Sequence, residues 1–325
     1  MSHLRFWGKH RTLIATGVWI CALLAVLPQT RAQTPAGQAQ DRAELLRTTT
    51  NLREEPSVEV NAGDSEHAIS SPNDPDLGEQ AILKRAEHYQ AFTFFASAPI
   101  SYTSNVALVR NGEEDDLLFT PAVGVSFAPR ITRTLFANIG FSQQFFYYDR
   151  FDGLNFASLD FRAGLVYTIP SAHYLVLRAD YDFNRLTTED LDHEFFRDHA
   201  LGFGAELPFR IGRAQQVTVG ADFSFSVAAH PDAPARHDYS GYVGYSVSLT
   251  RALALSAVGR LAVRDYVEGG RTDVSEILAF GASYRINTWL SANAIATFAW
   301  NDSNQDVFHY EVANVGGALS LSMRF

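Results

Sequence analysis

Cysteine, methionine and long apolar segments are nearly absent from this sequence. Its 325 residues include one cysteine, Cys21, and two methionines. A disulfide scaffold is therefore excluded. After residue 32 no stretch holds 18 consecutive apolar residues, so no transmembrane helix is expected there. A glycine-rich phosphate loop, a Cys/His zinc set and a nucleic-acid motif are also missing, and we expect no cofactor, no metal and no nucleic-acid partner.

The N-terminus has the pattern of a secretory signal peptide. Arg5, Lys9 and Arg11 precede a mostly apolar run over residues 13–27, and Thr30-Arg31-Ala32 places small residues at the positions that a signal peptidase reads. The run is shorter than the ~20 residues of a spanning helix, which argues against a retained anchor. We predict a signal peptide over residues 1–32 and an exported mature chain.

The last residues of the chain alternate between two kinds of side chain. From residue 313 to Phe325 every odd position is apolar or glycine, and the even positions are Asn314, Gly316, Ala318, Ser320, Ser322 and Arg324. A period of two is typical of a strand with one apolar face. A long strand of this kind ending in an aromatic residue resembles the closing strand of a Gram-negative outer-membrane β-barrel. The resemblance implies that Phe325 belongs to the insertion signal read by the barrel-assembly machinery. The alternative is an edge strand of a soluble sandwich.

The same alternation recurs through residues 91–325. It predicts strands near 92–108, 117–129, 133–149, 155–169, 173–187, 196–210, 215–229, 237–250, 252–266, 273–287, 289–301 and 308–325. Short connections alternate with longer polar ones, as in transmembrane barrels with periplasmic turns. An exported chain without a spanning helix crosses a membrane only as a closed barrel, because every backbone N–H and C=O inside lipid must be hydrogen-bonded within the protein. We predict an all-β fold, a transmembrane antiparallel up-and-down β-barrel of about 12 strands in the bacterial outer membrane, with both termini periplasmic.

Residues 33–90 have the composition of a linker. Residues 33–75 contain no aromatic residue and offer too little apolar surface to offset the entropy of ordering. Apolar residues recur at helical spacing between residues 76 and 89. We predict a disordered periplasmic linker with one short helix near residues 76–89. That helix would plug the periplasmic mouth of the barrel, bind a periplasmic partner or remain a solvated part of the tether.

Ionisable residues on the polar face form two arcs. The acidic wall consists of Asp160, Asp180, Asp182, Glu206 and Asp222, with Arg162 and Arg178 among them. The basic wall consists of Arg260, Arg264, Arg285 and Arg324. In a twelve-strand cylinder these arcs face one another, and charged walls of this kind select solutes in channels. The alternative is a sealed lumen of buried ion pairs.

The sequence gives little support to catalysis. It contains no His-x-Ser pair of the kind found in outer-membrane phospholipases, and its main carboxylate–histidine set is Glu189–Glu194 with Asp198 and His199. The hard oxygens of that set are also suited to a divalent cation. Because acidic external loops are ordinary in such barrels, we expect neither an enzyme nor a metal site.

Three segments resemble a known hairpin. Residues 100–106 (ISYTSNV), 115–116 (DD) and 119–126 (FTPAVGVS) resemble the first hairpin of outer-membrane proteins of the β-barrel porin type, some of which are associated with exopolysaccharide export. Together with the barrel architecture, this favours a passive diffusion channel for small hydrophilic solutes, with membrane lipid, lipopolysaccharide and the barrel-assembly machinery as partners. The alternatives are a non-conducting structural or interaction barrel, including an accessory of polysaccharide export, and an outer-membrane hydrolase.

Overall fold

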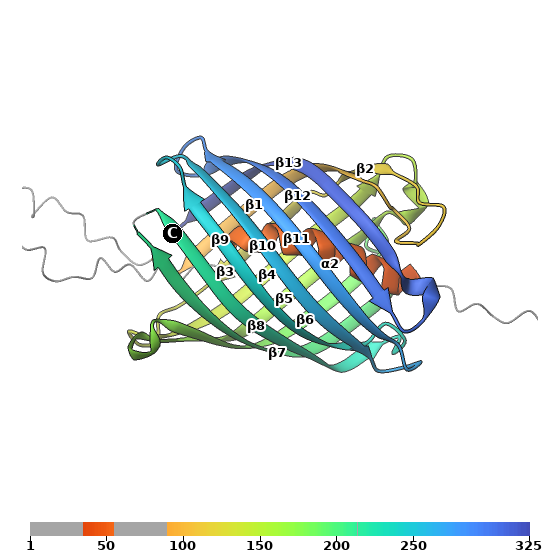
Figure 1. Cartoon of the computed structure of the whole chain (residues 1–325), viewed down its shortest axis with the longest axis horizontal. Coiled ribbons are helices and arrows are strands. Elements are labelled where there is room, and N and C mark those ends of the chain that lie inside the picture. Colours follow the sequence, from red (N-terminus) through yellow and green to blue (C-terminus); the bar gives the residue numbers. More distant parts are fainter. Residues whose placement is uncertain (1–34, 55–89, 213) are drawn as a thin grey trace, which may run out of the picture. The chain divides into compact units, whose positions relative to one another are not determined.

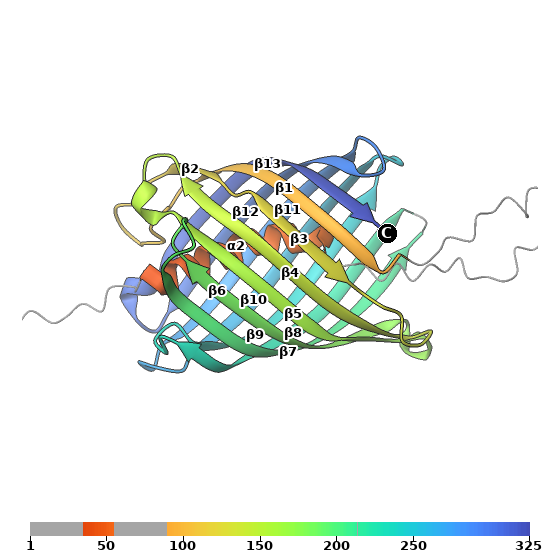
Figure 2. The ribbon, with the colours of Figure 1, turned by 180° about the vertical axis from the view of Figure 1, so that it is seen from behind.

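The computed structural model describes residues 35–54, 90–212 and 214–325. The predicted signal peptide and the helix expected near residues 76–89 lie outside these ranges. Within them the chain forms one α-helix, three short 3-10 helices and a single sheet. Figures 1 and 2 show this sheet curving into a barrel, seen from opposite sides.

The strands pair antiparallel with their neighbours around the sheet. They are β1 (Phe92–Thr103), β2 (Asp116–Phe119), β3 (Ala122–Phe127), β4 (Leu135–Tyr148), β5 (Phe156–Ile169), β6 (Leu175–Thr187), β7 (Glu194–Ile211), β8 (Gln215–His230), β9 (Arg236–Ser248), β10 (Leu253–Tyr266), β11 (Thr272–Arg285), β12 (Leu290–Ser303) and β13 (Tyr310–Arg324). The 3-10 helices lie in connections and are η1 (Asp152–Leu154), η2 (Pro170–Ala172) and η3 (Asp306–Phe308).

β2 and β3 share one position in the wall. Both pair with β1 on one side and with β4 on the other. The break between them falls at Thr120 and Pro121, and proline has no N–H to donate to a ladder. With these two segments taken as one strand and β13 paired to β1, the sheet closes as a twelve-strand antiparallel barrel. The fold class predicted from the alternation is confirmed.

The closing seam joins the two ends of the barrel segment. β1 and β13 pair from Thr93 opposite Arg324 to Thr103 opposite Asn314. Phe325 N donates to Phe92 O at 2.9 Å, and Phe92 N donates to Phe325 O at 3.2 Å. Closure leaves no sheet edge, as a spanning sheet requires.

Alternate residues of each strand point away from the lumen, and these are the apolar ones. Phe203 on β7 is 49% exposed, Phe280 on β11 is 48% exposed and Leu319 on β13 is 56% exposed. Exposed aromatic and aliphatic side chains of this kind occur on nearly every strand. Such an apolar exterior is stable against lipid and unfavourable in water.

The connections at the two ends of the barrel differ less than the sequence suggests. Those at one end are residues 104–115, 149–155, 188–193, 231–235, 267–271 and 304–309. Those at the other end are residues 128–134, 170–174, 212–214, 249–252 and 286–289. The first set includes the longest connection, and we call its side the long-loop end and the opposite side the short-turn end. The first residue of β1 and the last of β13 both lie at the short-turn end.

The helix α2 (Pro35–Glu54) lies inside the barrel. Its alanines Ala36, Ala39 and Ala43 are buried against one side of the wall, and Leu45 is buried against the other. The wall residues on the first side include Phe146, Phe156, Leu186 and Phe196, and those on the second side are Ile277, Ala299, Tyr310 and Val312. Contacts to both sides place α2 in the lumen.

The direction of α2 follows from its contacts along the barrel. Gln38 donates from Nε2 to Ala107 O, in the connection between β1 and β2, at 3.0 Å. Leu46 lines a cavity with Ile100 of β1 and Ile295 of β12. The helix therefore begins at the long-loop end and runs towards the short-turn end.

The prediction of a disordered linker is wrong for residues 35–54. It treated the segment as a chain in water, where it has too few apolar residues to fold. Inside the barrel the wall supplies both apolar surface and charged partners, and residues such as Ala, Gln, Glu, Leu and Arg favour a helix once it is sheltered. No helix among the described residues has the length and apolar character to cross a membrane.

Candidate functional site in the barrel lumen

Four arginines converge near the long-loop end of the lumen. Arg236 begins β9, Arg260 and Arg264 lie on β10, and Arg271 ends the connection before β11. Pairing places Arg264 opposite Asp238 of β9 and opposite Asp273 of β11. Because residues on these strands alternate between lumen and lipid, the arginines point inward with the two aspartates. We call these four residues the arginine cluster.

The helix supplies two carboxylates to the arginine cluster. Asp41 and Glu44 are three residues apart, and that spacing puts them on one face of α2. Asp41 Oδ1 lies 2.5 Å from Arg236 Nη1 and 3.9 Å from Arg264 Nη1. Arg271 Nη2 lies 3.9 Å from Asp41 Oδ2.

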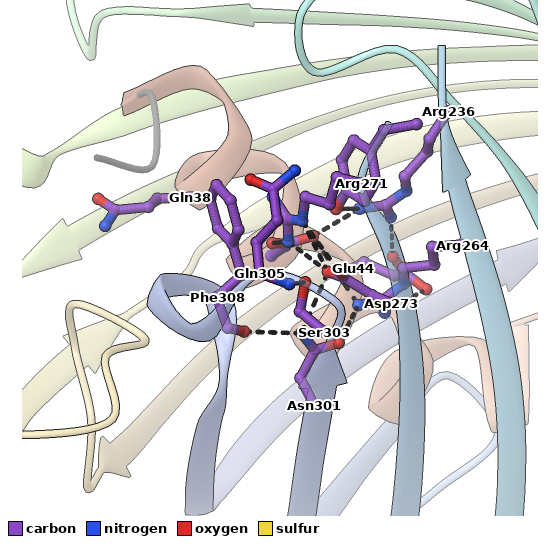
Figure 3. A network of polar contacts seen from close by, with 12 residues as sticks. Gln38, Glu44, Arg236, Arg264, Arg271, Asp273, Asn301, Ser303, Gln305 and Phe308 are labelled. Carbon is purple, nitrogen blue, oxygen red and sulfur yellow. Dashed lines mark hydrogen bonds and ion pairs between the residues drawn. The ribbon is translucent and has the colours of Figure 1, made fainter. Parts of the chain in front are cut away.

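Glu44 lies close to Arg236 and Arg264 in the same cluster (Figure 3). Its Oε1 lies 3.1 Å from Arg264 Nη2 and 3.9 Å from Arg260 Nη1, and its Oε2 accepts a hydrogen bond from Arg236 Nη2. Arg264 is 0% exposed, so its charge is sheltered from water. A buried charge without a partner is costly, and the carboxylates of α2 therefore hold the helix against this part of the wall.

The wall itself supplies further partners. Arg271 Nε donates to Asp273 Oδ1 at 2.9 Å, and Arg236 Nε lies 3.0 Å from Asp238 Oδ1. Asn301 Nδ2 donates to Asp273 Oδ2 at 3.1 Å.

Two aromatic rings also hold the Arg271 guanidinium. Its Cζ lies 4.0 Å from the ring centroid of Tyr266 and 3.6 Å from that of Phe308, within the range of a cation–π contact. The position of Arg271 is thus fixed by the barrel as well as by the helix.

The opposite face of α2 is small and apolar. Ala39 and Ala43 pack against aromatic residues of β4 and β5, where the rings of Phe146 and Phe156 stack with centroids 4.1 Å apart. Alanine side chains let the helix approach these rings closely while burying less apolar area than leucine would. Arg42 is also buried, with its guanidinium 5.6 Å from the ring centroid of Tyr148.

The predicted acidic wall lies on adjacent strands and carries its own basic partners. Arg162 Nε donates to Asp182 Oδ1 at 2.6 Å, and Arg178 Nη2 donates to Asp222 Oδ1 at 3.0 Å. Gly204 lies between Arg178 and Asp222 in the register. A Cβ at this glycine would approach Asp222 Oδ1 to 2.6 Å, so the glycine makes room for the ion pair.

Hydroxyl and amide groups also contact the acidic wall. Asp160 accepts hydrogen bonds from Ser158 Oγ at 3.0 Å and Asn184 Nδ2 at 2.8 Å. Glu206 accepts a hydrogen bond from the Tyr242 hydroxyl at 2.7 Å. Asp180 lies on β6 opposite Gly164 and Gly202 of the neighbouring strands.

The predicted basic wall is divided between two places. Arg260 and Arg264 belong to the arginine cluster, whereas Arg285 and Arg324 are exposed at the short-turn end. Arg285 donates from Nη2 to Arg251 O in the neighbouring turn. The structure thus differs from two open arcs facing each other across water, because α2 lies between the walls and pairs with one of them.

Sequence reasoning missed Arg236, Arg271, Asp41 and Glu44 as members of the site. The helix carboxylates and the wall arginines that they contact are far apart in the chain, since 195 positions separate Asp41 from Arg236. The i, i+3 pair of carboxylates in a helix-favouring segment was the available signal. Composition alone gave the opposite prediction.

The acidic loop between β6 and β7 has local partners. Arg185 Nε donates to Glu194 Oε2 at 2.7 Å. Asp190 accepts hydrogen bonds from the Thr188 hydroxyl and from Asp192 N, and the first of these is the main reason that the pKa of Asp190 is lowered. No metal-binding group of three or more His, Cys, Asp or Glu side chains occurs among the described residues.

Comparison with known proteins finds structures that share the fold of this chain. No protein-family model matches the sequence, and no curated protein matches it. The COG4313 outer membrane channel from Pseudomonas putida F1 is 10% identical with a TM-score of 0.51, and the match covers 72% of this chain and 96% of that one. The translocator domain of autotransporter NalP from Neisseria meningitidis is 12% identical with a TM-score of 0.44, over 91% of this chain and 99% of that one. The first likeness shows the fold: the chain forms a closed antiparallel β-barrel similar to that of an outer-membrane channel.

Proposed function

We propose that the protein is an outer-membrane channel for small hydrophilic solutes in which α2 is an internal plug. The observation that carries the proposal is the position of α2 in the lumen, held by Asp41 and Glu44 against the arginine cluster. A solute crossing the barrel has to pass the space that the helix fills. Conduction therefore depends on whether α2 stays or leaves.

Several features favour a plug that can leave. The apolar contacts of α2 come largely from alanines, which contribute less burial energy than larger side chains. Residues 55–89 join α2 to the barrel, and a chain of that length reaches on the order of 100 Å when extended. The helix is thus tethered to the barrel without being tied to one position by a short connection.

The second candidate is a non-conducting barrel that α2 seals permanently. It is favoured by the depth of the ion pairs, since Asp41 is 1% exposed and Arg264 is 0% exposed. Breaking a buried pair costs on the order of 3–5 kcal/mol, which would keep the helix in place. In that case the barrel would act through its loops or its periplasmic segment, as a structural or polysaccharide-export accessory.

Conductance in planar bilayers tests the two candidates. The mature chain is expected to show low conductance, and a variant lacking residues 33–54 is expected to show larger, steady conductance because its lumen is clear. A variant lacking residues 55–76 is the matched control, since it shortens the tether and keeps α2. The full chain then decides between the candidates: if it never opens to the conductance of the variant lacking residues 33–54, with that variant folded as judged by heat-modifiable mobility, the sealed barrel stands.

A further inference from the structure

We propose that the arginine cluster is a binding site for a carboxylate-bearing solute, and that Asp41 and Glu44 of α2 occupy this site while the solute is absent. The inference rests on the proposed channel function and adds the class of solute and the means of gating. In this scheme the helix and the solute compete for the same guanidinium groups.

The balance of charge in the wall is the first argument. Among the described residues, the wall carboxylates paired with the arginine cluster are Asp238 and Asp273. They leave two of the four arginine charges unbalanced, and Asp41 and Glu44 of α2 balance them. With the helix gone, the lumen at this level carries an excess of positive charge between low-dielectric walls, which attracts anions.

Unused hydrogen-bond donors are the second argument. The Nε groups of Arg260 and Arg264 are buried and have no hydrogen-bond partner among the described residues, although both arginines lie within ion-pair distance of Glu44. A buried donor without an acceptor is unfavourable, so the helix occupies the cluster without satisfying it. A free ligand whose carboxylates are not fixed to a rigid helix can place its oxygens against these donors and so fits the cluster better.

The chemistry of the helix side chains identifies the ligand class. Guanidinium groups bind carboxylates through paired hydrogen bonds, and α2 presents two carboxylates on residues whose Cβ atoms are ~5–6 Å apart. The rings of Tyr266 and Phe308 keep Arg271 in place when the helix is absent. Glutarate, a five-carbon dicarboxylate, imitates the two carboxylates, and glutaramide is its uncharged counterpart.

The test compares two variants of the full chain in planar bilayers. Asp41→Asn with Glu44→Gln weakens the hold of α2 and keeps the arginine cluster. Adding Arg260→Gln and Arg264→Gln weakens the same hold and removes much of the positive charge. The double variant is expected to conduct more than the unmodified chain, with a reversal potential shifted towards that of chloride.

Glutarate provides the second measurement on the same variants. It is expected to block the double variant at a concentration about tenfold or more below that of glutaramide, as charge-assisted pairing predicts. The fourfold variant is expected to conduct with little preference for chloride and without block by glutarate. Should the double variant fail to fold, the chain lacking residues 33–54 presents the same cluster without the helix carboxylates and takes its place.

The outcomes separate this inference from the proposed channel. A conducting double variant without anion preference and without glutarate block overturns the inference and leaves the channel. Block by inorganic phosphate at the same concentration as glutarate overturns the assignment to carboxylates. No conductance from the double variant or from the chain lacking residues 33–54 overturns the channel itself.

Discussion

Leu278 and Ser224 illustrate how far single residues can be interpreted from the sequence. The period of two places Leu278 on the outer face of β11 and Ser224 on the inner face of β8, and the structure agrees, with Leu278 44% exposed. Alternation depends on nearest neighbours, so it is readable without knowing the fold. The partner of an inward residue is not readable in this way. Arg236 and Asp41 meet only because a helix early in the chain lies in the lumen.

A substitution at these two positions tests the lipid and lumen faces. Leu278→Arg is expected to lower the free energy of unfolding by roughly 2–4 kcal/mol, because Leu278 lies near the middle of β11 and faces lipid. Ser224→Arg is the control, since it faces the lumen opposite Gly202 and Asp238. Chemical unfolding in detergent or lipid measures both. Equal losses for the two variants would contradict the assignment of faces.

The sequence predicted the strands of the barrel and missed the helix α2. The strands of the barrel follow from their own alternation, and even the interruption between β2 and β3 has a local cause in Pro121. The helix α2 has no comparable local cause. Its apolar face is mostly alanine, and its charged face is stabilised by arginines of the wall, so its stability comes from the barrel that surrounds it. The composition of a segment indicates how much apolar surface the segment can bury by itself. The helix α2 is instead stabilised by contacts with the barrel wall, which its own composition does not show.

Crowding the alanine face should release the helix. Ala43→Trp adds a large ring at a position that is 1% exposed, in the cluster that contains Phe146 and Phe156. Overpacking of this kind costs about 1–3 kcal/mol, and here the helix can escape it by leaving the lumen. We expect higher conductance and faster proteolysis of residues 33–89, with the barrel still heat-modifiable. Ala43→Ser, which adds one atom, is the matched control. Unchanged conductance in the tryptophan variant would argue for a permanent seal.

At the scale of the molecule, α2 and the closing strands are anchored at opposite ends of the barrel. β1 begins and β13 ends at the short-turn end, where Phe325 exchanges backbone hydrogen bonds with Phe92. The helix α2 begins at the long-loop end. The prediction that both termini are periplasmic was argued from an even number of strands, and that argument concerns the barrel segment alone. The described start of α2 lies at the opposite mouth.

Removal of the last residue tests the closing seam. Deleting Phe325, or changing it to Asp, is expected to abolish assembly of the barrel while leaving export intact, because the terminal aromatic is 67% exposed at the end of the closing strand. The measurement is the amount of heat-modifiable protein in the outer-membrane fraction. Phe325→Tyr keeps an aromatic ring and is expected to assemble. Normal assembly of the Asp variant would argue against a role for Phe325 in insertion.

The orientation of the whole barrel can be tested with single cysteines. The one cysteine, Cys21, belongs to the predicted signal peptide, so a mature chain carries only the thiol that is introduced. Glu113 is exposed in the long connection after β1, and Arg133 is exposed in the turn before β4. Short turns of outer-membrane barrels lie in the periplasm. A membrane-impermeant maleimide applied to intact cells should therefore label Glu113→Cys and not Arg133→Cys, and both should be labelled after lysis. Labelling of Arg133→Cys alone in intact cells would show the opposite orientation of the barrel. The first residues of α2 would then lie on the periplasmic side rather than at the cell surface.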